Sequence, residues 1–123
     1  MKKKLNSSTL QRSPCPIASA LDIVGDKWSL LIIRDMSLFA KHKNKDFQNA
    51  GEKIPTNILA NRLLSLVENG LVEKRLYQNK PPRYEYHLTD AGKGLVPVIQ
   101  SLAIWANEYI DGVSIPDFTH KSK

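Results

Sequence analysis

The residues best suited to molecular recognition lie in the stretch Pro55–Gly70, which carries amide, guanidinium and hydroxyl side chains at helical spacing. On a helix these polar side chains would form one face, consisting of Asn57, Asn61, Ser65 and Glu68, with Arg62 at its border. Asparagine can pair through two hydrogen bonds with adenine, and arginine with guanine, in a DNA major groove. An ordinary amphipathic helix that shows its polar side to water would have the same pattern. The stretch therefore indicates either a DNA-reading face or a solvated one.

The same stretch has the residue types that begin and end a helix. Thr56 is a predicted N-cap, because its hydroxyl can accept a hydrogen bond from a backbone N–H one turn further on. Gly70 is a predicted stop, since glycine enters the left-handed conformation after a helix without steric cost. Between them the apolar side chains gather on one face, formed by Leu59, Leu63, Leu66 and Val67. We therefore expect an amphipathic helix with a buried side and an amide-rich side.

The composition is that of one globular domain with a basic surface. The chain has 123 residues, of which 41% are hydrophobic and 24% charged, and its formal net charge is +6. A basic balance favours an anionic partner such as nucleic acid, and less often a membrane surface or an acidic protein. The basic residues outside the amide-rich helix fall mostly in clusters: Lys2, Lys3, Lys4 and Arg12; Lys41, Lys43 and Lys45; Lys74, Arg75, Lys80 and Arg83; Lys121 and Lys123. Clusters on both sides of the helix favour nucleic acid.

The sequence argues against membrane, secreted and enzymatic roles. No run approaches the roughly eighteen apolar residues of a membrane span, and the N-terminus has no apolar signal-peptide core. Cys15 is the single cysteine, which excludes an internal disulfide framework. His42, His87 and His120 lack metal-ligand spacing, and no phosphate-binding loop or nucleophile motif is present. We therefore expect a cytoplasmic protein that is not an enzyme and uses no metal or cofactor.

Two helices are predicted in the first third of the chain, after a flexible basic arm at residues 1–13. Ile17–Val24 has helical spacing of its apolar residues, and Gly25 ends it. Asp26 is the predicted N-cap of a second helix that runs to about Phe39. This second helix is apolar nearly all round, so we expect it to be the central core helix.

A short third helix is predicted just before the amide-rich one. Asn44 is its predicted cap, the helix covers Lys45–Ala50, and Phe47 is its single clear apolar anchor. Two helices joined by a tight turn, the second with an amide-lined face, have the layout of a helix-turn-helix.

After Gly70 the pattern changes to that of a β-hairpin. Leu71–Tyr77 has strand character, and Tyr84–Leu88 alternates between apolar and polar residues. The segment between them contains two consecutive prolines, which favour a turn and cannot donate ladder hydrogen bonds. A hairpin with Lys80 at its tip, directly behind a helix-turn-helix, is a predicted wing.

A long final helix is predicted from Asp90 to about Tyr109, with Thr89 as its cap and a kink at Pro97. Its apolar residues form a stripe made of Leu95, Val98, Ile99, Leu102, Trp105, Ala106 and Tyr109. The small domain in front has little surface to cover such a stripe, so we expect a partner chain to bury it. Residues 111–123 are a predicted polar tail.

Together these elements resemble the HxlR-type winged helix-turn-helix transcription regulators. Three ordered blocks carry the resemblance: Cys15-Pro16 followed by A-L-D-I-V-G-D-K-W-S-L-L-I-I-R-D at residues 20–35, N-I-L-A-N-R-L-x-x-L-x-x-x-G-L-V at residues 57–72, and Y-x-x-x-P-P-R-Y-E-Y-x-L-T-x-x-G at residues 77–92. The resemblance implies an α+β, mostly α, fold: a winged helix-turn-helix over residues 14–110 with N- and C-terminal dimerisation helices. In the homodimer that it implies, Ile17 and Leu21 of the first helix join the apolar stripe of the last.

The resemblance also implies which side chains face DNA. Those of the recognition helix are Thr56, Asn57, Asn61 and Arg62, with Ser65 on the same face. The two asparagines are candidates for base-edge readout, and Arg62 for a base or a phosphate. Arg62 could instead pair with Glu68 or with a residue of the third helix.

The wing offers two further DNA-contact candidates, Lys80 and Arg83, which would bind phosphates. The alternative for both is a solvated hairpin tip. Arg83 begins a strand, so it could also form an ion pair with Glu85 or Glu73.

Cys15 is open to two interpretations. It can be a small, half-buried residue at a helix start, or a redox or electrophile sensor, because a helix N-terminus favours the reactive thiolate. Some members of the resembled family sense oxidants or quinones through a cysteine at this place. With no second cysteine in the chain, a switch here would need a disulfide between the two Cys15 residues of a dimer or an adduct with a small molecule.

The sequence therefore predicts a homodimeric regulator that binds a double-stranded DNA operator, with an effector that the sequence does not identify. The rival function is a winged-helix module for protein–protein contact without DNA binding. A third option, an enzyme or small-molecule carrier, would need a nucleophile, metal set or pocket signal that the sequence does not offer.

Overall fold

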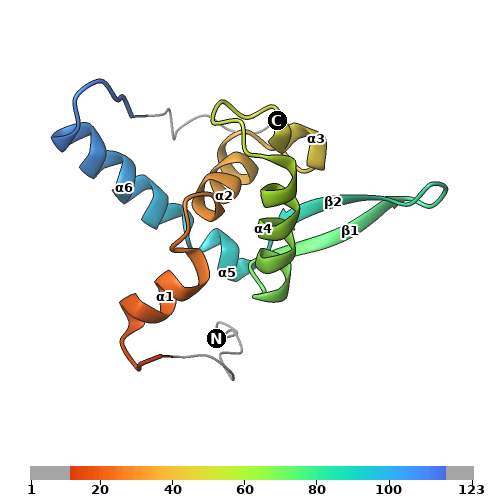
Figure 1. The fold of residues 1–123 in the computed structure, drawn as a ribbon, viewed down its shortest axis with the longest axis horizontal. Coiled ribbons are helices and arrows are strands. Elements are labelled where there is room, and N and C mark those ends of the chain that lie inside the picture. The colour runs from red at the N-terminus through yellow and green to blue at the C-terminus, as the bar shows by residue number, and fades with distance from the viewer. Residues whose placement is uncertain (1–11, 116–123) are drawn as a thin grey trace.

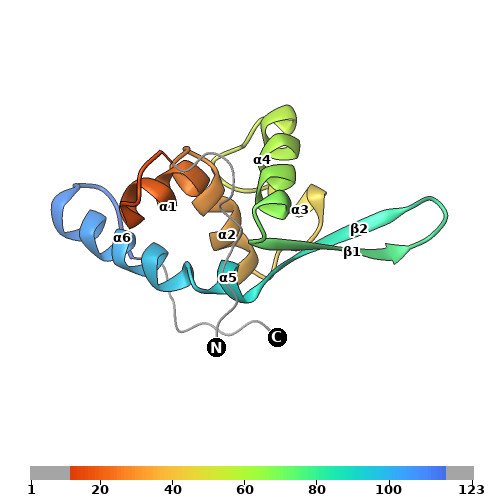
Figure 2. The ribbon, with the colours of Figure 1, turned by 90° about the horizontal axis from the view of Figure 1, so that it is seen from below.

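Six helices and two strands follow one another in residues 12–115, the part of the chain that this computed structural model describes (Figures 1 and 2). Their bounds are α1 Pro16–Val24, α2 Ser29–Leu38, α3 Asn44–Gln48, α4 Thr56–Glu68, β1 Val72–Gln78, β2 Arg83–Leu88, α5 Asp90–Lys93 and α6 Val96–Tyr109. The fold is the predicted winged helix, in which α3 and α4 form the helix-turn-helix and the β1–β2 hairpin is the wing. The predicted domain limits stay a prediction, because residues 1–11 and 116–123 lie outside the described part.

The centre of the fold is α2, as its apolar sequence predicts. Ile33 is fully buried, and Ile32 and Met36 are nearly so. They belong to one core with Phe47 of α3 and the leucines of α4. Figure 2 shows α2 between two groups of elements, with α1 and α6 on one side and α4 and the hairpin on the other. The core therefore connects the helix-turn-helix to the helices that carry the exposed apolar residues.

The buried face and the end of α4 confirm the sequence prediction. Leu59, Leu63 and Leu66 are almost completely buried. Gly70 has a φ of 79°, the left-handed conformation that ends many helices. The N–H of Leu71 donates to the carbonyl of Leu66 at 3.0 Å, which satisfies an orphan carbonyl of the last turn. The Gly70 conformation and this hydrogen bond together define the direction in which the chain leaves α4 and enters the hairpin.

The predicted starts of α4 and α3 are wrong by one residue. Thr56 is the first helical residue and not the cap, because the extended residue before the helix is Pro55, and the Thr56 hydroxyl makes no capping hydrogen bond. Asn44 likewise lies inside α3. The extended residue there is Lys43, whose N–H donates to the Asp46 carboxylate at 3.2 Å. The Asp46 carboxylate therefore accepts the hydrogen bond from the Lys43 N–H, and Asn44 does not act as the cap.

Asp26 caps α2 as predicted, but it lies three residues before the first helical residue and not directly before it. The helix begins at Ser29, and the Asp26 carboxylate accepts hydrogen bonds from the N–H groups of Trp28 at 2.9 Å and Ser29 at 3.0 Å. Trp28 is half-buried and packs against the core, as predicted. The connection between α1 and α2 is therefore held by one carboxylate.

The hairpin is antiparallel, with Lys74 opposite Tyr86 and Leu76 opposite Tyr84. Both strands start within one residue of their predicted positions. The loop before α3 pairs with the hairpin edge, because the N–H of Tyr86 donates to the carbonyl of His42 at 2.7 Å. This pairing holds the start of α3 beside the wing, which projects from the body of the molecule (Figure 1).

The predicted final helix is in fact two helices, α5 and α6, and this part of the prediction is wrong. α5 ends at Lys93, and α6 begins at Val96 with Pro97 in its first turn, where proline removes no helical hydrogen bond and causes no kink. Thr89 caps α5 as predicted, accepting from the N–H of Gly92 at 3.2 Å. A Cβ on Gly92 would collide with the backbone carbonyl of Leu71, so the close packing of α5 on the start of the hairpin requires glycine.

The apolar stripe of the last helix divides into two sets. Leu95 and Ile99 are half-buried and pack against the core of their own chain, and a further contact with a second copy stays a prediction. Ala106 is half-buried, and the other stripe residues are exposed: Val98, Leu102, Trp105 and Tyr109. Ile17 and Leu21 of α1 are exposed as well. The burial of these exposed side chains in a homodimer stays a prediction. None of the helices in residues 12–115 has the length and apolar character needed to cross a bilayer.

Candidate nucleic-acid interface

The outward face of α4 carries the predicted recognition residues. Asn57 and Asn61 are exposed opposite the buried leucines, and Thr56 is exposed at the start of the helix. Sequence reasoning missed two apolar members of this face, Ala60 and Leu64, the second of which is 58% exposed. Helical spacing alone would have placed both there. Small and apolar side chains can contact a thymine methyl group in a major groove, so these two residues fit the predicted use.

The two asparagines are not equivalent. The carbonyl oxygen of Asn61 accepts hydrogen bonds from Arg62, at 3.0 Å from Nε and 2.6 Å from Nη2. No hydrogen bond to another described residue engages the Asn57 amide. Two-pronged pairing with adenine needs both the carbonyl oxygen and the amino group of the side chain. Asn57 therefore has both groups available, whereas Asn61 acts together with Arg62.

Arg62 forms an ion pair, as one of the two sequence-based alternatives expected, but with a partner that the sequence did not predict. Its guanidinium lies 3.4 Å from the carboxylate of Asp26, between α1 and α2, and its side chain is 25% exposed. The proposed alternatives, Glu68 and a residue of α3, are therefore wrong. Partial burial acts to raise the pKa of Asp26, but hydrogen bonds from Ser29 and Trp28 and the charge of Arg62 outweigh it, so this pKa is lowered. The ion pair links the outward face of α4 to the start of α2.

Ser65 is half-buried near the end of α4. The Nδ2 of Asn69 donates to its backbone carbonyl at 2.9 Å and to its hydroxyl at 3.3 Å. These bonds support the helix end, and a DNA contact by Ser65 stays a prediction.

The turn that leads into α4 is held by Arg34 of α2. Its Nη1 and Nη2 donate to the two carboxylate oxygens of Glu52 at 3.1 and 2.8 Å, which is a two-pronged pair. Its Nε also donates to Asp35 at 3.0 Å. The hydrogen bond from Arg34 lowers the pKa of Glu52, whereas burial raises the pKa of Asp35 despite the same guanidinium. A single side chain thus joins the core helix to the helix-turn-helix.

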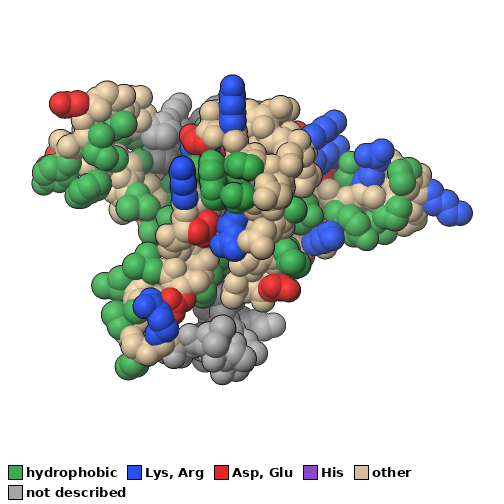
Figure 3. Space-filling view, in the orientation of Figure 1, with side chains coloured by type: hydrophobic (Ala, Val, Ile, Leu, Met, Phe, Trp, Pro, Cys, Tyr) green, Lys and Arg blue, Asp and Glu red, His purple; other side chains and the backbone are tan. Residues whose placement is uncertain are grey.

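The wing residues Lys80 and Arg83 are exposed and make no ion pair with any residue in the range 12–115. The alternative partners of Arg83 are engaged elsewhere, since Glu73 pairs with Arg75 and Glu85 with His87. That alternative is therefore wrong. Figure 3 shows Lys and Arg side chains gathered along the hairpin, on the same side of the molecule as α4.

Lys43 and Lys45, which sequence reasoning placed in a basic cluster without a DNA-contact role, lie beside this wing. The Nζ of Lys43 is 4.7 Å from the ring centre of Tyr77. Only the pairing of the His42 loop with β2 brings these lysines to the hairpin, so no local pattern could have identified them.

Cys15 is exposed and occupies the N-cap position of α1. Its N–H donates to the hydroxyl of Ser13 at 3.1 Å. Exposure contradicts the interpretation of Cys15 as a half-buried packing residue. Its use as a sensor stays a prediction.

Two of the histidines meet in space although they are far apart in sequence. The rings of His42 and His87 are stacked with their centres 4.3 Å apart, and Nδ1 of His42 lies 3.0 Å from the carbonyl oxygen of Tyr86. Across residues 12–115, no group of three or more His, Cys, Asp or Glu side chains is arranged to hold a metal ion.

Comparison with known proteins identifies the domain. The model of the HxlR-like helix-turn-helix family matches residues 23–114. The HTH-type transcriptional regulator Rv3095 of Mycobacterium tuberculosis (strain ATCC 25618 / H37Rv) is 38% identical over 94 residues, which are 76% of this chain and 58% of that relative. This chain therefore matches less than two thirds of the length of that relative.

Solved structures share the same arrangement. The crystal structure of PA1607 superposes with a TM-score of 0.72 at 34% identity, covering 91% of this chain and 75% of PA1607. The redox regulator HypR in its oxidized form superposes with a TM-score of 0.70 at 29% identity, covering 79% of this chain and 99% of HypR.

Proposed function

Since the chain belongs to the HxlR-like helix-turn-helix family of transcriptional regulators, we propose that it regulates transcription by binding a double-stranded DNA operator as a homodimer. The observation that carries the proposal is the outward face of α4, where exposed amides lie beside a wing whose Lys80 and Arg83 have no ion partner among residues 12–115. A surface that is only solvated would not require exposed amides next to cations without ion partners. The proposed role requires no catalysis, metal or cofactor.

Affinity and specificity come from different residues in this proposal. Lys80 and Arg83 displace counterions from phosphates, which gives most of the affinity and makes it depend on salt. Thr56 and Asn57, at the exposed start of α4, enter the major groove, and Asn57 reads a base edge. Arg62 holds Asn61 in place and contacts DNA only if it exchanges Asp26 for a phosphate or a base.

The homodimer is supported by the exposed apolar residues of α1 and α6. Ile17 and Leu21 on α1, and Leu102, Trp105 and Tyr109 on α6, are each about half exposed or more. Large apolar side chains gathered in this way on a small domain favour association. Two copies related by a two-fold axis would read half-sites about 34 Å apart or a multiple of that distance.

The decisive experiment is the selection of bound sequences from random duplexes by the purified protein. We expect enrichment of an inverted repeat, because a symmetric dimer reads each half-site in the same way. Enrichment of a single unrepeated site would contradict the homodimer. Negligible duplex affinity at low salt, with the fold intact by circular dichroism, would contradict DNA binding and favour the protein–protein module.

Asn57→Ala and Lys80→Ala should weaken DNA binding in distinguishable ways. Asn57→Ala should cost about 1–3 kcal/mol at one base position and relax the preference there. Lys80→Ala should weaken all sequences alike and reduce the salt slope by about one. Equilibrium binding to a panel of single-base variants of the selected duplex, at several salt concentrations, separates the two effects. A uniform loss for Asn57→Ala would rule out base readout by this residue.

A second candidate function, redox control, rests on the exposure of Cys15 at the N-cap of α1 and on the likeness to the redox regulator HypR. Because the chain has one cysteine, the proposed switch joins the two Cys15 residues of a dimer. Two thiols lose two protons and two electrons to a peroxide, which is reduced to water, and a disulfide forms between the chains.

Cys15→Ser should abolish this response while leaving DNA binding under reducing conditions unchanged. Wild-type protein treated with peroxide should migrate as a disulfide-linked dimer on non-reducing gels and change its duplex affinity, and a thiol reductant should reverse both. Treatment with a quinone tests the alternative adduct by mass spectrometry. A Cys15→Ser variant that responds to peroxide like the wild type would exclude the switch.

A further inference from the structure

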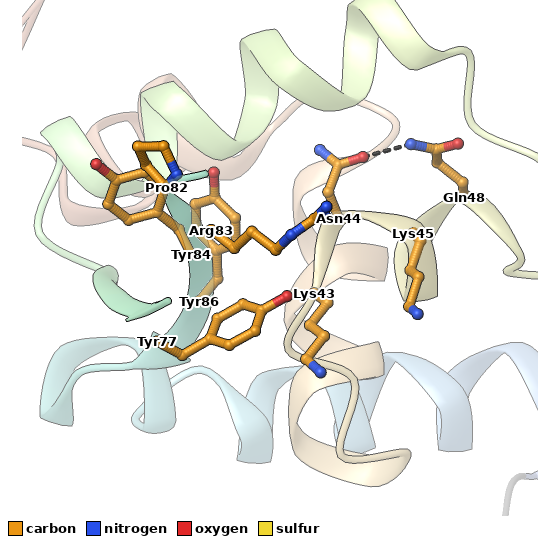
Figure 4. Close-up of a pocket in the computed structure, with 9 residues that line it drawn as sticks. All are labelled: Lys43, Asn44, Lys45, Gln48, Tyr77, Pro82, Arg83, Tyr84 and Tyr86. Carbon is orange, nitrogen blue, oxygen red and sulfur yellow. Dashed lines mark hydrogen bonds between the residues drawn. The ribbon is translucent and has the colours of Figure 1, made fainter. Parts of the chain in front are cut away.

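A groove of about 380 Å³ separates α3 from the wing (Figure 4). Its lining residues are Lys43, Asn44, Lys45 and Gln48 on the α3 side, and Tyr77, Pro82, Arg83, Tyr84 and Tyr86 on the hairpin side. In Figure 4 the Arg83 side chain reaches from the hairpin toward Asn44, and the Tyr77 hydroxyl points toward Lys43. The groove therefore brings together cations, amides and aromatic rings from two elements that are separate in sequence.

The groove has excess positive charge. Lys45 and Arg83 form no ion pair with the residues in the described range, and the Lys43 ammonium lies 4.7 Å from the centre of the Tyr77 ring. The nearby carboxylates are engaged, since Asp46 accepts from the Lys43 N–H and Glu85 pairs with His87. Like charges held close together favour an anionic occupant that neutralises them.

The polar and aromatic lining specifies more than negative charge. The Asn44 and Gln48 amides and the tyrosine hydroxyls can donate hydrogen bonds to phosphate oxygens. The rings of Tyr77 and Tyr84, together with Pro82, supply apolar surface for a sugar, and the ammonium groups of Lys43 and Lys74 lie 4.7 and 4.3 Å from the centres of the two rings. This lining fits the alternating sugars and phosphates of a nucleic-acid backbone.

The position of the groove favours duplex DNA as the source of that backbone. α4 packs against both α3 and β1, so the groove lies beside the proposed reading helix. In the proposed complex, the phosphates that flank the bases contacted by Asn57 pass beside α3 and the wing, because both elements adjoin α4. We propose that the groove binds the sugar–phosphate backbone of the operator strand next to the bases read by α4, with Lys43 and Lys45 as phosphate ligands.

This site rests on the proposed DNA binding. It adds phosphate contacts that neither the recognition helix nor the tip of the wing provides. Lys45 is the best residue to test, because it is exposed and its replacement leaves no buried group without a partner. Lys93 of α5 is a matched control, since it is also an exposed lysine on a short helix but lies away from the groove lining.

The experiment compares Lys45→Ala, Lys45→Arg and Lys93→Ala on the selected duplex over a range of salt concentrations. Lys45→Ala should weaken binding roughly 3-fold to 10-fold and lower the salt slope by about one, as expected for the loss of one phosphate contact. Lys45→Arg should retain the slope, and Lys93→Ala should match the wild type. Circular dichroism checks that all variants remain folded.

Duplexes with single neutral methylphosphonate linkages then locate the contact. One substitution beside the half-site should weaken the wild type but have no further effect on Lys45→Ala, because the contact is already lost. Equal effects of Lys45→Ala and Lys93→Ala, or no linkage that couples to Lys45, would overturn the groove assignment while leaving DNA binding standing. A wild-type protein that binds no duplex would overturn both proposals.

Discussion

Leu63→Ala is expected to lower the free energy of unfolding by about 2–5 kcal/mol, the usual cost of removing a buried leucine side chain. Leu63 is 2% exposed and lies between Leu59 and Leu66 in the core that joins α4 to α2. Its truncation leaves a cavity that the surrounding helices fill only partly. Urea denaturation followed by circular dichroism measures the loss as a lower midpoint with an unchanged slope.

The adjacent Leu64 provides the control, because it is the same residue type on the same helix but is 58% exposed. Leu64→Ala should change the free energy of unfolding by no more than about 0.5 kcal/mol. If Leu64 faces a major groove, this variant should lose DNA affinity while keeping its stability. Equal destabilisation by the two substitutions would contradict the orientation of α4 on the core, and with it the assignment of the reading face.

Arg34→Ala should destabilise the fold by about 3 kcal/mol at neutral pH, because it leaves a buried carboxylate without its partner. The side chain of Asp35 is only 4% exposed, and Arg34 donates two hydrogen bonds to it. The same substitution frees Glu52, so the turn before α4 loses its connection to α2. We therefore expect weaker DNA binding even at temperatures where the variant is folded.

The cost of Arg34→Ala should shrink as the pH falls. Arg34 lowers the pKa of Glu52, so the stability from this pair is present above the unfolded pKa and is lost as the pH falls through the folded pKa. Burial raises the pKa of Asp35, and Arg34 opposes that rise only while Asp35 is charged. Once both acids are protonated, Arg34 has no carboxylate to stabilise.

Urea denaturation at neutral pH and at about pH 3, below the ordinary carboxyl pKa values, tests this dependence. The matched variant is Arg34→Ala with Asp35→Asn, which removes the unpaired buried charge and should be more stable at neutral pH than Arg34→Ala alone. The electrostatic explanation fails if Arg34→Ala costs as much at the lower pH as at neutral pH. In that case the lost packing of the arginine stem would account for the effect.

Local patterns in the sequence determined the helix-turn-helix, the wing and the buried side of α4. The spacing of Leu59, Leu63 and Leu66 decides which side of the helix is buried, and Gly70 decides where it stops, because both effects act within a few residues. The alternation in β2 and the prolines before it act over the same short range. The family resemblance likewise rests on residue types in order along the chain.

Only the tertiary structure decided which distant side chains meet. Arg62 pairs with Asp26 and Arg34 with Glu52, and the lysines before and within α3 reach the wing because His42 pairs with Tyr86. The close packing of α5 on the start of the hairpin also depends on a distant contact, that of Gly92 with the Leu71 carbonyl. Periodicity and caps specify the local backbone and the buried face of each element. The partner of an exposed charge, and the shape of a groove between two elements, depend on how the elements pack together.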